Sequence, residues 1–170
     1  MARVHVIGFG NRYQGDDGFG PAVCRLLQAR PLPRDVRVFD AGTAGLNALS
    51  CFEGCARAIV LDAVGGPGPA GRLLRLSPDD PLPPARAFSA HALGLDHLLR
   101  VLPLALDRVP ALEIIGAVVD NIRPFGLELS PPLAEAAARA VDLICRAVGA
   151  HPAVEPSPLD ADRRACASST

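Results

Sequence analysis

A chain of 170 residues is long enough to form one domain with a sizeable core. The near balance of 17 basic and 18 acidic residues, a net charge of -1, argues against a dedicated nucleic-acid surface, which would need a basic excess. No apolar run reaches the length of about 20 residues that crosses a membrane, and the N-terminus lacks a signal-peptide pattern. We therefore expect a cytoplasmic protein, with a monomer as the simplest state.

The first predicted unit is a strand, a glycine-rich turn and a helix. The apolar run over residues 4–7 predicts the strand, and Gly8-Phe9-Gly10-Asn11 follows as a loop. The adjacent carboxylates of Asp16 and Asp17 precede an apolar pattern with helical spacing that begins at Phe19. A glycine-rich turn before a helix usually holds a phosphate, but two negative charges stand at that place here. The charge of this acidic corner argues against a phosphate site.

The rest of the chain alternates predicted strands and helices. Further strands are predicted over residues 36–39, 58–61, 73–76 and 112–119. Further helices are predicted over residues 46–52, up to about Leu102 before Pro103, and from Ser130-Pro131 to Gly149. The tail 151–170 is rich in Pro, Ser, Asp and Arg, so we expect it to be disordered. The prediction is a single domain over residues 1–150.

This alternation predicts an α/β fold with a mostly parallel sheet of about five strands and helices on both faces. Sites in such folds lie beyond the carboxyl ends of the strands. Asp40 and Asp62 each end a predicted strand, and Asp16-Asp17 lies just past the first one, so three acidic loops should converge on one rim. Gly10 and Gly18 are expected to let the chain turn sharply toward this rim.

The acidic rim and a histidine form a candidate metal site. Taken singly, Asp17 could be only a helix N-cap, Asp40 and Asp62 could cap turns, and His91 could start a helix or lie in the core. Together, carboxylates at one rim repel one another unless a cation or proton lies among them. Two carboxylates and one imidazole from separate loops would suit zinc, nickel, cobalt or manganese.

Three other interpretations concern different residues or a different chemistry. Cys51 and Cys55 would face one side of a helix and could form a two-ligand metal site, although cysteines routinely fill packing faces. A Rossmann-like nucleotide-binding protein would use residues 8–10 as the start of G-x-G-x-x-G, but Tyr13 replaces the third glycine and the acidic corner would repel the pyrophosphate. A phosphoryl-accepting receiver module would use Asp62 as acceptor, but such modules also use a lysine, and the chain has none.

Four motifs, in this order, resemble those of the nickel-iron hydrogenase maturation proteases. They are Gly8-Phe9-Gly10-Asn11 with Gly15-Asp16-Asp17-Gly18-Phe19-Gly20, then Asp40-Ala41-Gly42-Thr43-Ala44-Gly45, Leu61-Asp62-Ala63, and Ser89-Ala90-His91-Ala92-Leu93-Gly94-Leu95. The resemblance covers most of residues 3–149 and implies a three-layer fold with a twisted central sheet.

The resemblance also implies a site and an activity. Asp17, Asp62 and His91 would be the metal-binding and catalytic residues, with Asp16 and Asp40 as candidates for orienting water or supporting His91. The activity would be an endoproteolytic cut that removes the C-terminal extension of the [NiFe]-hydrogenase large-subunit precursor after nickel insertion. Nickel would arrive with the precursor, and zinc or cadmium would also fit the site. The alternative is a non-catalytic nickel-checking module that only binds the precursor.

Overall fold

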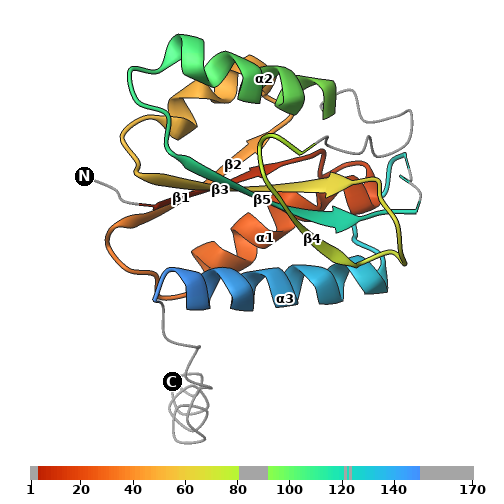
Figure 1. Ribbon diagram of the computed structural model, residues 1–170. Coiled ribbons are helices and arrows are strands. Elements are labelled where there is room, and N and C mark those ends of the chain that lie inside the picture. Colours follow the sequence, from red (N-terminus) through yellow and green to blue (C-terminus); the bar gives the residue numbers. More distant parts are fainter. Residues whose placement is uncertain (1–3, 81–91, 121, 123, 150–170) are drawn as a thin grey trace, which may run out of the picture.

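The computed structural model describes residues 4–80, 92–120, 122 and 124–149 (Figure 1). Within them one five-stranded sheet has the order β2-β1-β3-β5-β4. Its strands are β1 (Val4–Phe9), β2 (Val36–Gly42), β3 (Arg57–Val64), β4 (Leu73–Leu76) and β5 (Ala111–Val118). Only β4 is antiparallel to its neighbour in this sheet, which confirms the predicted mostly parallel arrangement. The predicted tail, 151–170, and His91 lie outside the described residues.

Helices cover both faces of the sheet (Figure 1). The helices α1 (Phe19–Gln28) and α3 (Pro131–Ala147) pack on one face, and α2 (Ala92–Ala105) and the 3₁₀ helix η2 (Gly45–Phe52) pack on the other. A second 3₁₀ helix, η1 (Gly15–Gly18), connects β1 to α1. The molecule therefore has the three layers that the sequence predicts.

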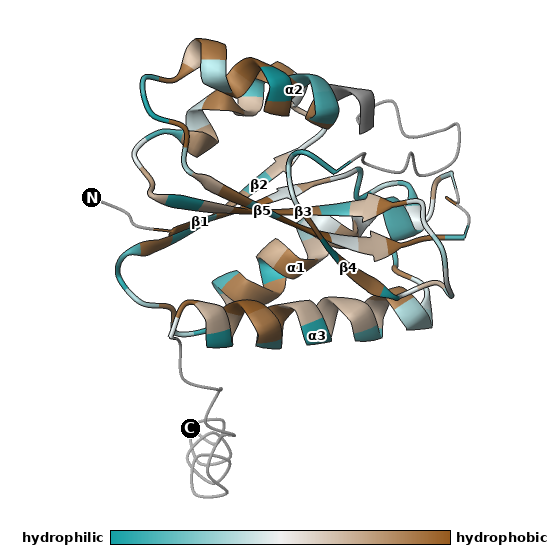
Figure 2. Ribbon diagram, viewed as in Figure 1, coloured by the Kyte–Doolittle hydropathy of each residue, from teal (hydrophilic) through white to brown (hydrophobic). Residues whose placement is uncertain are grey.

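Side chains that alternate along the central strands form two hydrophobic cores, one on each face of the sheet. In β1, Val6 packs toward α1 and α3, whereas Ile7 packs toward α2 and η2. In β3, Ile59 packs toward α1 and α3, and Val60 packs toward α2 and η2. A strand that is covered on both faces needs an uninterrupted apolar run, which is the pattern of residues 58–61. Figure 2 shows these hydrophobic strands between the helical layers.

Three predicted boundaries are wrong, for two physical reasons. The strands β2 and β3 continue past residues 39 and 61, because pairing with neighbouring strands extends them, so Asp40 and Asp62 lie inside strands. Pro103 does not stop its helix, since α2 continues to Ala105. A proline in the last turn removes only one helical hydrogen bond, and the next turn is closed by the Leu106 N–H donating to the Leu102 carbonyl at 3.0 Å.

The order of the strands creates a switch point beside β1. After β1 the chain returns through α1 on one face to reach β2, and after β2 it crosses through η2 on the other face to reach β3. The pairing of β1 with β3 ends at Gly8 and Leu61, whereas β3 continues along β5 to Val64. The carboxyl ends of β1 and β3 therefore separate, and crevices of this kind hold the sites of open α/β sheets.

No helix among the described residues has the length and apolar character needed to cross a lipid bilayer.

Candidate active site

Glycines allow the backbone at the start of α1 to lie in direct contact with β1 and β3, next to the acidic corner. A Cβ atom on Gly20, at the start of α1, would lie 2.2 Å from the Phe9 carbonyl oxygen and 2.8 Å from that of Leu61. A Cβ atom on Gly8 would lie 2.6 Å from the Gly20 carbonyl oxygen. Only glycine fits at such distances. Sequence reasoning missed the importance of Gly8 and Gly20, although the glycine spacing on both sides of the corner was the available signal.

Asp17 is fully buried at the end of η1. Its Oδ2 accepts the backbone N–H of Asn11 at 2.9 Å. The N-cap of α1 is Gly18, and no side chain makes a capping hydrogen bond there. The interpretation of Asp17 as a helix N-cap is therefore wrong. Its carboxylate points into the protein, toward the turn that follows β1.

Asp62 is 2 % exposed and lies in β3 opposite Gly116 of β5. Its Oδ1 accepts the N–H of Ala63 at 2.8 Å. Because side chains alternate along a strand, Asp62 belongs to the same face as Val60, which α2 and η2 cover. Asp62 also follows Leu61 directly, where β1 leaves β3. It therefore lies at the switch point, against which η1 also packs.

The structure thus places two carboxylates inside the protein at the separating ends of β1 and β3. A buried charge is costly unless hydrogen bonds, a partner or a metal ion offset its lost hydration. Each carboxylate accepts a backbone N–H, and these two bonds orient the side chains. A donor set of carboxylate oxygens fits a divalent cation with oxygen and nitrogen preferences.

Asp16 and Asp40 have other partners. The Asp16 carboxylate accepts the backbone N–H of Ser130 at 2.6 Å and its hydroxyl at 2.8 Å. Asp40 accepts an N–H of the Arg12 guanidinium at 2.5 Å and the backbone N–H of Gly42 at 3.1 Å. Their support of an attacking water or of His91 stays a prediction.

The third predicted ligand, His91, lies outside the described residues, directly before the first residue of α2. Within the described part of the chain, no group of three or more His, Cys, Asp or Glu side chains is placed to hold a metal ion. The complete ligand set therefore stays a prediction. For Cys51 and Cys55, partial burial raises the pKa of both thiols, which keeps them protonated and weakens them as metal ligands.

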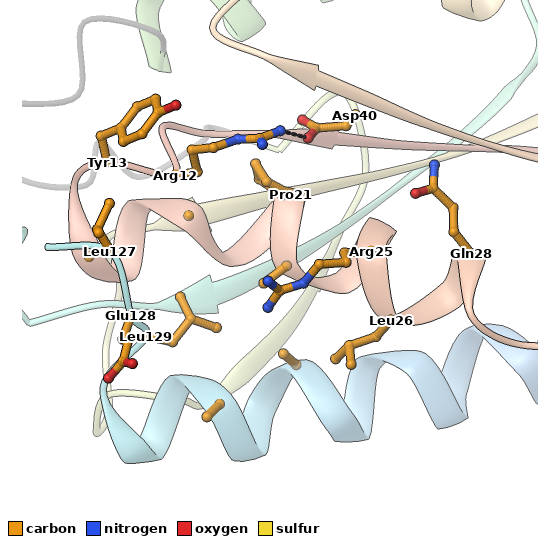
Figure 3. A pocket seen from close by; sticks show the side chains of 15 residues that line it. Arg12, Tyr13, Pro21, Arg25, Leu26, Gln28, Asp40, Leu127, Glu128 and Leu129 are labelled. Atoms are coloured by element: carbon orange, nitrogen blue, oxygen red, sulfur yellow. Dashed lines mark hydrogen bonds and ion pairs between the residues drawn. The ribbon is translucent and has the colours of Figure 1, made fainter. Parts of the chain in front are cut away.

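Two adjoining hollows meet beside Arg12 and Tyr13, in the turn after β1. The smaller, of about 380 Å³, lies between the turn after β1 and the end of β2. The larger, of about 850 Å³, lies between α1 and α3. Both are lined by Arg12, Tyr13 and Asp40, and Figure 3 shows the Arg12 side chain directed toward Asp40. Asp17 and Asp62 line neither hollow, because both are buried beneath the rim.

The fold and these carboxylates define a class: a doubly wound α/β domain with buried carboxylates near the carboxyl ends of its strands. Residues 21–147 match the model of one family, described as hydrogenase maturation protease. The chain belongs to this family, and it is therefore a peptidase.

Individual relatives agree with the assignment. The hydrogenase expression/formation protein HupD of Bradyrhizobium diazoefficiens is 33 % identical over 149 residues, which cover 85 % of this chain and 77 % of that protein. The hydrogenase maturating endopeptidase HybD of Escherichia coli superposes with a TM-score of 0.73 at 26 % identity, covering 85 % of this chain and 91 % of that one. A hydrogenase 2 maturation peptidase of a Thaumarchaeota archaeon is 35 % identical, with a TM-score of 0.64 over 88 % of this chain and 99 % of its own. These likenesses confirm the predicted fold class.

Proposed function

We propose that this chain is an endopeptidase that removes the C-terminal extension of a [NiFe]-hydrogenase large-subunit precursor after nickel has been inserted. The observation that supports this most directly is that Asp17 and Asp62 are both buried beside the place where β1 and β3 separate. Membership of the hydrogenase maturation protease family supports the class of substrate. The nickel ion belongs to the precursor, so it is part of the substrate rather than a resident cofactor.

In this proposal Asp17, Asp62 and His91 bind the nickel that the precursor brings. The position of Asp62 supports the set, because it belongs to the face that α2 covers and His91 is the residue before α2. Three protein ligands leave open positions on a divalent ion for groups of the substrate. A metal ion held there polarises a carbonyl group or lowers the pKa of a bound water.

The hydrogen bonds to the two carboxylates support a preorganised site. The N–H of Asn11 holds Asp17 and the N–H of Ala63 holds Asp62, so neither side chain has to reorient when a cation arrives. Fixed groups that need no reorganisation are the main source of electrostatic stabilisation in enzymes. Zinc and cadmium, which accept the same ligand atoms, are proposed to occupy the site as well.

The proposed compartment is the cytoplasm. The cysteines within the described residues, Cys24, Cys51, Cys55 and Cys145, are all free thiols. Free thiols in this number are expected where glutathione and thioredoxin keep cysteines reduced, which supports the proposal.

The test is cleavage of purified precursor, followed by the mass of the product. Nickel-loaded precursor should lose a C-terminal peptide when it is incubated with the full chain, and nickel-free precursor should not. Asp62→Asn should still bind the precursor without cleaving it. If the wild-type chain binds nickel-loaded precursor and its mass stays unchanged, the protein is a nickel-checking module and the proposed activity is wrong.

A further inference from the structure

The acidic corner is held by hydrogen bonds at two points to the segment 126–130, which leads into α3. The Asp16 carboxylate accepts both the N–H and the hydroxyl hydrogen of Ser130, at 2.6 and 2.8 Å, across 114 residues of sequence. The Gly15 N–H donates to the Gly126 carbonyl at 2.8 Å. Both contacts start in η1, which also contains Asp17. The position of η1 therefore depends on the segment 126–130.

Ser130 is used differently from an ordinary helix cap. A serine at the N-cap normally accepts an N–H from the first turn of its own helix. Here no side-chain capping bond forms, and the hydroxyl donates to Asp16 instead. The negative charge of Asp16 thus stands at the N-terminus of α3, where the helix dipole stabilises it. No acidic residue occupies the first turn of α3 itself.

Asp16 and Asp17 are neighbours in a single 3₁₀ turn, so their side chains diverge by about 120° around its axis. When Ser130 holds Asp16 on the outer side, Asp17 is directed inward. There its Oδ2 meets the N–H of Asn11 at 2.9 Å. Fixing one aspartate toward α3 therefore fixes the other toward the switch point.

We propose that Asp16 is a positioning residue for the cleavage reaction, which clamps η1 to Ser130 and so holds the Asp17 carboxylate in its productive orientation. The inference rests on the proposed function for its catalytic part, but its geometric part is tested separately. It differs from a direct role of Asp16 on the attacking water, because the clamp needs groups that hydrogen-bond to Ser130 and does not need a base.

Substitutions separate these two roles. Asp16→Asn keeps an oxygen for the Ser130 N–H, and its amide can donate to the Ser130 hydroxyl, so the clamp survives without the charge. Asp16→Ala removes both bonds, and Ser130→Ala removes only the bond from the hydroxyl. A double variant, Asp16→Ala with Ser130→Ala, measures whether the two residues act as one unit.

The first measurement is hydrogen exchange at the Asn11 amide, which reports the Asp17 contact without any substrate. Asp16→Ala should lower the protection of the Asn11 amide from exchange about tenfold or more. Ser130→Ala should lower this protection less, and Asp16→Asn should leave it nearly unchanged. The amides of Val6 and Ile7 in β1 are the control, and their protection should not change. If Asp16→Ala does not fold, Ser130→Ala is the test. Unchanged protection of Asn11 in the folded variants overturns the proposal.

The second measurement is cleavage of nickel-loaded precursor, with kcat and KM determined separately. Asp16→Ala should lower kcat about 10- to 100-fold with little change in KM, as loss of a supporting contact does. Asp16→Asn should restore most of the rate, and the double variant should be no worse than Asp16→Ala. Equal loss in Asp16→Asn and Asp16→Ala would mean that Asp16 acts chemically. A wild-type chain that cleaves nothing would refute the proposed function, while the exchange data still decide the clamp.

Discussion

Gly10 lies directly against the carbonyl group of Asp17. A Cβ atom on Gly10 would fall 2.0 Å from that carbonyl oxygen, and the φ angle of Gly10 is +129°, which L residues rarely adopt. The turn after β1 and the 3₁₀ helix that contains Asp17 are therefore in van der Waals contact through their backbones. This contact sets how far Asp17 lies from the end of the strand.

The first prediction is that Gly10→Ala displaces the acidic corner. The methyl group meets rigid backbone and the φ angle is strained, so the free energy of unfolding should fall by about 3 kcal/mol or more. Precursor cleavage should be lost in whatever fraction remains folded. Chemical denaturation and the cleavage assay measure the two effects.

The matched control is Gly45→Ala, where the φ angle of +53° is also unfavourable but no heavy atom lies within 4 Å of the added carbon. Gly45→Ala should lower the free energy of unfolding by only about 1 kcal/mol, and the variant should still cleave the precursor. If Gly10→Ala and Gly45→Ala lost equal amounts of stability and of cleavage activity, backbone strain, and not the contact with Asp17, would explain the effect. Gly18, for which the sequence predicts the same sensitivity, should be intermediate, since its added carbon would lie 3.2 Å from Arg12 Cα and its φ is -76°.

The second prediction concerns the proposed ligands. Asp17→Asn, Asp62→Asn and His91→Ala should each reduce cleavage at least about a hundredfold, because metal polarisation of the substrate contributes several kcal/mol. The fold should persist, and Asp62→Asn should unfold at the same or a higher temperature through relief of carboxylate repulsion. The control is His97→Ala, an exposed position on α2, which should cleave normally. Normal cleavage by His91→Ala, or loss of cleavage only through unfolding, would contradict the assignment.

The third prediction uses an ion-pair cluster that links three strands. Glu113 of β5 accepts from Arg57 of β3 at 2.5 Å and from Nε of Arg75 of β4 at 2.7 Å. Burial alone would raise the pKa of Glu113, but the hydrogen bonds and positive charges of the two arginines together lower it below its ordinary value of 4.5. A lowered pKa stabilises the folded state above about pH 4.5, and the contribution disappears as the pH falls through the folded-state pKa.

Glu113→Gln should therefore lower the free energy of unfolding by about 1 kcal/mol at pH 7, the upper range for partly exposed pairs. The difference from wild type should shrink as the pH falls below 4.5. Urea denaturation across this pH range gives the comparison. Asp96→Asn is the control, because the Asp96–Arg100 pair is exposed on one helix and should contribute little. A difference that stays constant down to pH 3 would exclude the charge as its cause.

The fourth prediction concerns the buried thiol of Cys24, in α1 beside β1 and β2. Burial, together with the smaller effect of the Asp40 charge, raises its pKa to about 12, and its Sγ lies 3.3 Å from the Phe39 carbonyl oxygen. Only the thiolate reacts with iodoacetamide, so at pH 8 the native protein should leave Cys24 unmodified. The half-exposed Cys51 and Cys55 should react first, and all three should react in urea. Peptide mass mapping shows which cysteines are alkylated. Equal rates of alkylation for Cys24 and Cys55 in the native protein would contradict the buried position of Cys24.

Local sequence patterns were sufficient for most elements of the fold. The apolar run of β3, the helical spacing of α1 and the Ser130-Pro131 start of α3 each reflect a preference of a few neighbouring residues. The ends of the strands are harder to predict from local sequence, because β2 and β3 are extended by hydrogen bonds to strands distant in sequence. Such pairing leaves no local signal.

The sequence alone predicts acidic side chains near the carboxyl ends of the strands and glycines on both sides of the first acidic pair. It did not determine which aspartate faces which way, because Asp16 and Asp17 are chemically identical and adjacent. The direction of each side chain comes from the folded chain, which places Ser130 on one side of η1 and the Asn11 amide on the other. Side-chain direction in a short turn depends on such distant hydrogen bonds, and the intrinsic preferences of the two residues are the same.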